Sequence, residues 1–87
     1  MRLVWESVER WYDDNGKLKS LRLTRKYSIS DSQEVKIQVF TSYSASLGSW
    51  SEPTVSTEPP NLRYENFLKL CELVGRCVGD VKKLVHS

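Results

Sequence analysis

The sequence has very little of what most enzyme active sites need. It contains a single histidine, His86, and it has neither a P-loop nor a GxGxxG motif. His86 is the penultimate residue of the sequence, where a chain frays easily, and no second histidine accompanies it. A catalytic triad or a general base is therefore not indicated. We predict that the protein is not an enzyme and takes no small-molecule substrate.

Metal and disulfide sites lack their residues as well. Two cysteines, Cys71 and Cys77, and one histidine do not make a zinc-binding set, so we expect no metal and no cofactor. The two cysteines are six residues apart in a predicted helix and point to different faces, which disfavours a disulfide between them. We expect both to be reduced residues of the core or of an interface.

Long apolar runs are also absent. No stretch approaches the roughly 18 apolar residues of a membrane span, and residues 1–12 lack the apolar core and cleavage site of a signal peptide. We therefore expect an intracellular protein of the cytoplasm, nucleoid or nucleus, without a membrane partner. The 87 residues suffice for one small domain, 1–87, whose core alone is marginal, so a homo-oligomer is expected.

The excess of positive charge is small. A formal net charge of +2 excludes a histone-like polycation. The charges are unevenly spread, however, because residues 17–40 hold six Lys or Arg side chains and only two acidic ones. A local basic face in the middle of the chain is therefore expected.

Residues 1–46 have the pattern of antiparallel hairpins. Residues 4–12 are rich in β-branched and aromatic types, and the Asn15-Gly16 pair that follows is a strong hairpin signal. Residues 18–30 and 35–40 alternate apolar and polar side chains, with a second turn at 31–34 between them. This alternation predicts a sheet with one buried and one solvated face.

The rest of the chain changes its pattern twice. Residues 47–60 are rich in Ser and Pro, which predicts a loop with room for a short fourth strand at 53–57. Residues 61–86 have the helical period, with Asn61 as the expected N-cap. The predicted fold is α+β: a curved antiparallel sheet of three or four strands followed by one long C-terminal helix.

The apolar surface of the predicted helix is wider than one small sheet covers. This width favours a homodimer that forms through the helix, although a sheet that curls around the helix is an alternative. The expected dimer interface consists of Phe67, Cys71, Val74, Val78 and Val81.

The polar side of the predicted sheet carries the most informative residues. Basic side chains that hold phosphates, together with aromatic rings that stack on bases, are what single-stranded nucleic acid requires. The candidate binding residues are Trp11, Lys17, Lys19, Arg22, Lys26, Lys36, Phe40 and Trp50. A simpler interpretation is a solvated sheet face that protects an edge, and whether Trp5, Trp11 and Trp50 are core or binding residues stays open.

The order of predicted elements resembles the positive cofactor four family of transcriptional coactivators, roughly from Leu21 to Leu84. Lys26-Tyr27-Ser28-Ile29 and the segment 35–39 are similar to that family's central strand pair. The helix is similar in its opening and its closing residues, which are Asn61, Glu65, Phe67, Leu70 and Val81-Lys82-Lys83-Leu84. The chain departs from the family at residues 51–54, where the family is basic and contains glycine, and residues 1–18 have no clear counterpart.

The resemblance implies a helix-mediated dimer that binds single-stranded DNA along its strands, with Arg22, Lys26 and Lys36 facing the DNA. A small archaeal single-stranded-DNA-binding protein is a related alternative. From these observations we expect single-stranded nucleic acid, DNA before RNA, to be the partner. The alternative from another class is a non-enzymatic interaction or assembly module, for example of a virus, that docks a partner through the apolar helix.

Overall fold

The computed structural model describes residues 1–29 and 33–86. It contains five strands and one helix, in the order β1 (Arg2–Tyr12), β2 (Leu18–Ile29), β3 (Val35–Ser44), β4 (Ser49–Trp50), β5 (Thr54–Glu58) and α1 (Tyr64–Val85). The predicted α+β class, an antiparallel sheet followed by a C-terminal helix, is confirmed. The predicted turn at 31–34 lies in part outside the described residues.

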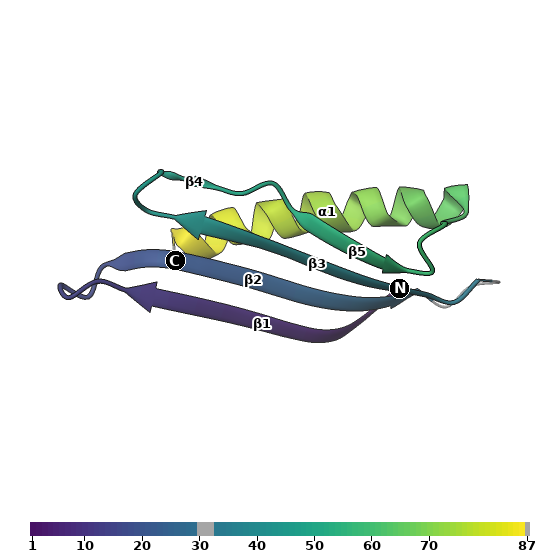
Figure 1. Cartoon of the computed structure of the whole chain (residues 1–87), viewed down its shortest axis with the longest axis horizontal. Coiled ribbons are helices and arrows are strands. Elements are labelled where there is room, and N and C mark those ends of the chain that lie inside the picture. Colours follow the sequence, from purple (N-terminus) through teal and green to yellow (C-terminus); the bar gives the residue numbers. More distant parts are fainter. Residues whose placement is uncertain (30–32, 87) are drawn as a thin grey trace.

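The strands form one antiparallel sheet in which β2 and β3 are central (Figure 1). β1 pairs with β2, and β2 pairs with β3 along ten successive residue pairs, from Ser20–Ser44 to Ile29–Val35. The far edge of β3 is shared, because β5 pairs with its first half and the two-residue β4 with its end. β1 is therefore one edge of the sheet, and β4 and β5 form the other.

The turn between β1 and β2 has the predicted hairpin chemistry. The Asp13 carboxylate accepts hydrogen bonds from the backbone N–H groups of Asn15 and Lys17, each at 2.9 Å. Gly16 has a φ of 78°, which is a conformation that glycine adopts without the steric cost of a Cβ atom. Local sequence thus determines this hairpin.

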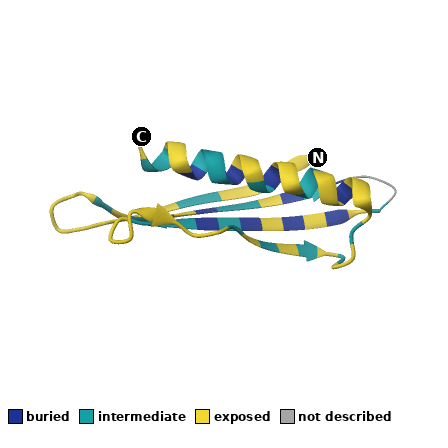
Figure 2. Ribbon diagram, turned by 90° about the horizontal axis from the view of Figure 1, so that it is seen from above, coloured by how far each residue is buried: buried dark blue, intermediate teal, exposed yellow. Residues whose placement is uncertain are grey.

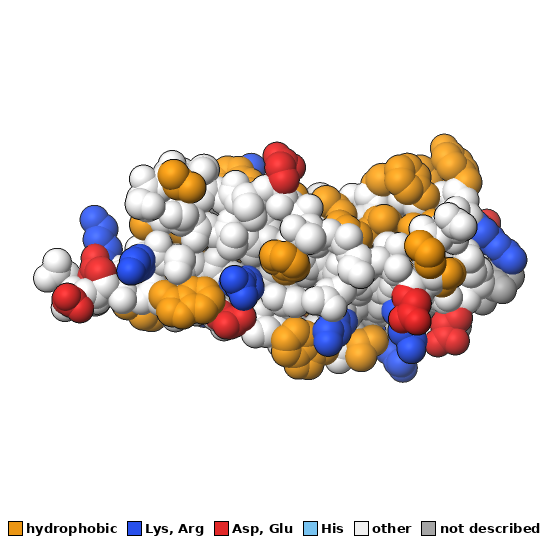
Figure 3. Space-filling model, in the orientation of Figure 1, with side chains coloured by type: hydrophobic (Ala, Val, Ile, Leu, Met, Phe, Trp, Pro, Cys, Tyr) orange, Lys and Arg blue, Asp and Glu red, His pale blue; other side chains and the backbone are white. Residues whose placement is uncertain are grey.

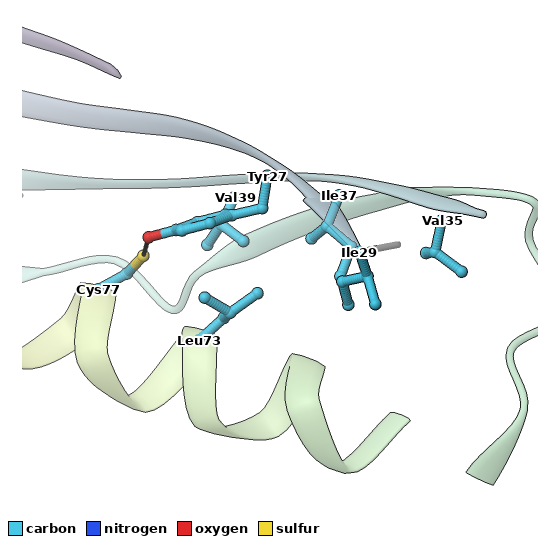
Figure 4. Packing of buried hydrophobic residues seen from close by; sticks show 7 residues of the cluster. All are labelled: Tyr27, Ile29, Val35, Ile37, Val39, Leu73 and Cys77. Atoms are coloured by element: carbon cyan, nitrogen blue, oxygen red, sulfur yellow. Dashed lines mark hydrogen bonds between the residues drawn. The ribbon is translucent and has the colours of Figure 1, made fainter. Parts of the chain in front are cut away.

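α1 covers one face of the sheet and packs on β2 and β3 (Figure 2). Alternate residues at 21–29 and 35–41 are buried beneath it, with the exception of Arg25, together with Leu73, Cys77 and Val81 of the helix. Leu73 and Cys77 point from α1 toward the strand residues, and the Tyr27 hydroxyl lies 3.9 Å from the Cys77 sulfur (Figure 4). Burial raises the pKa of the Tyr27 hydroxyl above its ordinary value, and Cys77 adds to this shift.

One ion cluster interrupts the apolar layer under the helix. Arg25 donates to the Asp80 carboxylate at 2.6 Å and lies 3.6 Å from the carboxylate of Glu6, so it connects β2 with both α1 and β1. Burial alone would lower the pKa of Arg25, but the hydrogen bond to Asp80 and the neighbouring Tyr27 outweigh it and raise the pKa. Arg25 is thus a charged structural residue inside the fold.

The start of α1 differs from the prediction. The helix begins at Tyr64, so the N-cap position belongs to Arg63, which has no side-chain cap, and not to Asn61. The amide group of Gln33 takes part of this role, because its oxygen accepts from the Arg63 backbone N–H at 3.3 Å and its nitrogen donates to the Asn61 carbonyl at 3.2 Å. Gln33, which lies just before β3 and is distant in sequence, therefore helps to set where the helix begins.

Two further boundaries were wrong in detail. β3 continues to Ser44, and β4 lies inside the predicted loop because Ser49 and Trp50 pair with the end of β3. The predicted short strand at 53–57 is confirmed as β5, shifted by one residue. Cys71 and Cys77 are both free, as predicted, with Cys71 exposed and Cys77 buried. Among the described residues no helix is long and apolar enough to cross a membrane.

The molecule is long and thin, with extents of 51 × 20 × 19 Å. Its radius of gyration is 14.6 Å, against about 12 Å for a compact domain of this length. It exposes 5908 Å², whereas a folded monomer of this mass exposes about 5,300 Å². β1 contributes much of this excess area, because most of its residues are exposed on both faces of the strand.

Candidate nucleic-acid interface

The side of the sheet that faces away from α1 is called the outer face here. Because strand side chains alternate, the buried residues of β2 and β3 leave their neighbours on this face. The register then assigns the facing residues of β1 and β5 to the same side. Its aromatic and basic members are Arg2, Trp5, Trp11, Arg22, Lys26, Lys36 and Phe40.

Two tryptophans on the outer face each lie next to a cation. The Lys26 ammonium is 5.0 Å from the centre of the Trp5 ring, and the Arg22 guanidinium is 5.8 Å from the centre of the Trp11 ring. Both rings remain exposed, at 48% and 43%. Figure 3 looks onto this face, and orange side chains with blue neighbours lie along the strands β1 and β2. Each pair combines a stacking surface with a phosphate-binding charge.

A shallow hollow of about 500 Å³ continues this surface toward β5. Three cations line it, which are Arg2, Lys26 and Lys36, and Lys26 is also the cation of the Trp5 pair. The other side chains that line it include the polar Ser28, Gln38 and Ser56, the apolar Val4, and two carboxylates, Glu34 and Glu58. The hollow therefore offers positive charge and hydrogen-bonding groups at one end of the exposed rings.

Acidic residues moderate the charge of the outer face. Glu9 lies between the two tryptophans on β1 and is opposite Arg22, and Glu58 on β5 is opposite Lys36. Positive groups still exceed negative ones on this face, because Arg2 and Lys26 have no acidic residue directly opposite them across the strands. The excess is modest, which agrees with the small net charge of the chain.

Four predicted binding residues lie together on the outer face: Trp11, Arg22, Lys26 and Lys36. Phe40 lies on the same face of β3, half-buried between Thr24 and Thr54 of the neighbouring strands.

The hairpin lysines are placed less centrally. Lys17 and Lys19 are exposed, Lys17 in the turn between β1 and β2 and Lys19 at the start of β2. They lie at the Trp11 end of the surface, away from the hollow.

Trp50, which was predicted to bind together with these residues, does not lie on the outer face. It pairs with Tyr43, which packs against the core cluster on the helix side of the sheet. The Lys82 ammonium of α1 lies 4.3 Å from the centre of the Trp50 ring. Trp50 lies on the inner side of the sheet because β4 pairs with β3. This position could not be predicted, because the sequence of the loop has no periodic pattern that indicates a face.

Trp5 was not among the predicted binding residues, because the sequence left open whether it is a core or a binding residue. Its six-residue spacing from Trp11 indicates one common face on a regular strand, and the structure places both rings there. Arg2 was also missed, because its place at the hollow depends on how β1 lies against β2.

The predicted dimer residues divide between core and surface. Val81 is fully buried against Leu21 and Leu23 and is a core residue of the monomer. It therefore does not belong to the predicted dimer interface. Phe67 and Cys71 are exposed, and Val74 and Val78 are half-buried on the flank of α1. An open groove of about 660 Å³ lies beside this flank, lined by Phe67 and Leu70 from the helix and by Val55 and Thr57 from β5.

No group of three or more metal-ligating side chains occurs among the described residues. No family model matches the sequence, and no curated protein or solved structure is significantly similar to it. The resemblance to the positive cofactor four family therefore stays a prediction, and the geometry of this chain has to support any functional assignment by itself.

Proposed function

We propose that the outer face binds single-stranded nucleic acid, with DNA as the first candidate. The observation that carries this proposal is the presence of two exposed tryptophans on one open sheet face, each within 6 Å of a cation. Exposed large rings are costly unless they are used, because each leaves a substantial apolar area in water.

The chemistry of the pairs fits a polyanion with aromatic bases. A base stacks on an indole ring with little dependence on its identity, and the adjacent Lys26 or Arg22 reaches a phosphate oxygen. Trp5 and Trp11 are six residues apart on one strand, a separation of roughly 20 Å. The two pairs would therefore hold different nucleotides of one strand, and the hollow near Lys36 would hold a further phosphate.

Unpaired strands fit this face better than a duplex. Duplex readers usually place a helix or a two-stranded ribbon in the major groove, where base edges are displayed. Here the aromatic surface lies on a sheet, and stacked base pairs would not offer their faces to it. Recognition of unpaired bases on the exposed rings of a sheet is a known physical solution.

The test is fluorescence anisotropy with a labelled oligo(dT) of about 20 nucleotides at about 50 and 200 mM salt. We expect affinity to fall steeply with salt, and Trp5→Ala or Trp11→Ala to weaken binding about 5- to 150-fold, since each stacked base contributes roughly 1–3 kcal/mol. Trp50→Ala is the matched control, because Trp50 is similarly exposed, at 39%, and also lies beside a cation, but on the other face.

The control variant should bind within about twofold of the wild type. Equal losses for all three tryptophan variants would mean that the outer face has no special role. No binding at low salt would overturn the proposal.

A second candidate function is docking of a partner protein through α1. The exposed apolar residues of the helix favour it, because Phe67 is 50% exposed beside the groove at β5 and Leu68 is 46% exposed. This function would be favoured over the first if the wild type binds no oligonucleotide in any condition and forms a complex with a partner protein that Phe67→Ser abolishes.

A further inference from the structure

The outer edge of β1 is the largest unpaired backbone surface of the sheet. β1 is 11 residues long and pairs with β2 alone within the part of the chain that the structure describes. The helix packs mainly on β2 and β3. Of the residues of β1 only Ser7 and Val8 are half-buried, and Val8 packs against the core beside Val81. A long exposed edge strand readily pairs with another strand, and proteins usually shorten or cover such edges.

Irregularities at both ends restrict the free edge to a central segment. The pairing of β1 with β2 shifts between Leu3 and Trp5 and again between Trp11 and Tyr12. Trp5–Trp11 is therefore a regular run, and Val8 is its midpoint. A strand that is regular around its centre and interrupted at both ends suits a partner that is related by a two-fold axis at that centre.

The sequence of this run complements itself around Val8. If two copies pair antiparallel with Val8 opposite Val8, Glu6 of each copy faces Arg10 of the other, and Trp5 faces Trp11. Opposite charges thus meet twice, and no like charges are directly opposed.

The neighbouring two-fold registers lack this complementarity. A centre at Ser7 would place Trp5 opposite Glu9 and Glu6 opposite Val8. A centre at Glu6, Glu9 or Arg10 would place a residue opposite its own like charge. Directly opposed like charges destabilise a strand pair, so the Val8 register is the favoured one.

We propose that β1 pairs with β1 of a second copy in this register, so that two sheets join into one. Such an interface is isologous and closes after two copies, and the remaining edges are short, since β4 has two residues and β5 has five. The excess exposed area of about 600 Å² per chain over a typical monomer is close to the ~800 Å² that each partner buries in a standard interface.

The pairing completes the binding surface, and this consequence rests on the proposed function. Across the joined edge, Trp5 of one copy lies beside Trp11 of the other on the outer face. The four rings and their cations then form one continuous platform, whereas each monomer offers two separate pairs. A nucleic-acid strand that crosses the two-fold axis would contact both copies of the protein.

The first test is the mass in solution by light scattering and sedimentation. We expect the wild type at twice 10.1 kDa, and Arg10→Glu and Glu6→Arg each at the monomer mass, because like charges then oppose each other. An equimolar mixture of these two variants should restore the dimer, because their charges are complementary.

Lys83→Glu is the control for Arg10→Glu, because it makes the same change of charge at an exposed position of α1. This variant should remain dimeric. Circular dichroism checks the fold, because Glu6 also lies near Arg25. A monomeric wild type, or variants that stay dimeric, would overturn the proposal.

The second test fixes the register by disulfide formation in a Cys71→Ser background. Val8→Cys should cross-link under mild oxidation, because directly opposite residues have Cα atoms about 4.5–5.5 Å apart. Ser7→Cys should not, because residues 7 of the two copies would be about 8 Å apart across the diagonal. The reverse result would contradict the register. A dimer that Phe67→Ser dissociates and Arg10→Glu does not would assign the interface to α1 instead.

Nucleic-acid binding separates the two proposals from each other. Arg10 is on the inner side of β1, so Arg10→Glu leaves the rings and cations of the outer face unchanged. If both proposals hold, this variant should keep the wild-type affinity for an oligonucleotide of about 5 nucleotides and lose about tenfold for one of about 20. A wild-type dimer without any affinity for oligonucleotides would refute the function and leave the pairing intact.

Discussion

The two faces of β2 are made by alternating residues of one strand, and they have opposite properties. Leu21, Leu23 and Ile29 turn inward and are almost completely buried under α1. Arg22 and Lys26 turn outward, each beside an exposed tryptophan of β1. The inner face consists of contacts that hold the fold together, whereas the outer face carries large rings that the fold leaves in water.

This difference separates stability from binding within one sheet. Trp50 makes the comparison sharper, because it has the same local chemistry as Trp5, a ring beside a lysine, but lies on the inner side. If exposed rings with cations only stabilised the sheet, all three tryptophans would be equivalent. The outer-face proposal requires that they differ.

The largest expected effect is on the inner face. Leu73→Ala should lower the free energy of unfolding by about 2–5 kcal/mol, because Leu73 is fully buried and its loss leaves a cavity. Leu68→Ala on the exposed side of the same helix should change it by less than about 1 kcal/mol. Urea denaturation followed by circular dichroism measures both, and equal effects would contradict the assignment of the core.

The ion cluster of the inner face should follow. Asp80→Ala removes the closer of the two carboxylates that pair with Arg25, whose side chain is 12% exposed, and should cost about 1.5–3 kcal/mol of stability. The exposed acidic residue Glu72 of α1, changed to Ala, provides the comparison in the same denaturation experiment. If Asp80→Ala left the stability unchanged, solvent would replace the ion pair without a cost in free energy.

On the outer face, charge reversal should act on binding and spare stability. Lys26→Glu should weaken oligo(dT) binding about tenfold and lower the slope of log affinity against log salt by about 1, since each phosphate contact contributes about 0.7. Lys82→Glu changes the net charge equally beside Trp50 and should keep the wild-type slope. Anisotropy titrations at several salt concentrations compare them, and indistinguishable slopes would remove the distinction between the faces.

The smallest effect concerns Tyr27 and alkaline pH. Its pKa is raised above the ordinary 10.0, so above about pH 10 the unfolded chain loses this proton more readily than the folded one. The contribution of the protonated Tyr27 hydroxyl to stability is fully present below pH 10, and it is lost as the pH rises through the pKa of the folded state. Tyr27→Phe should therefore flatten part of the decline in Tm above about pH 10. An unchanged decline in the variant would assign it to other groups.

Much of the sheet could be predicted from local patterns. The alternation of 18–30 identified which side of β2 is buried, and Asn15-Gly16 identified the hairpin, because both signals depend on neighbouring residues alone. The start of α1 could not be predicted, since Gln33 reaches it from another part of the chain. The exclusion of Val81 from the surface likewise depends on its packing against Leu21 and Leu23.

The candidate site shows the same division. Arg22, Lys26, Lys36 and Phe40 follow from strand alternation, and their shared face was predicted correctly. The tryptophans were left open, because an aromatic residue in a strand serves the core or a surface equally well by its sequence pattern. Their positions depend on which strand each one pairs with.

By itself, the sequence determined the three long strands, the helix and the two faces of the central strands, because periods of two and of 3.6 residues are local properties of the backbone. It also determined the self-complementary order of charges around Val8. Only the tertiary structure decided that β1 is an uncovered edge, that Trp5 and Trp11 share a face with the cations, and that Trp50 lies on the opposite side. Those facts depend on strand pairing and on the position of one helix, which bring together residues that are distant along the chain.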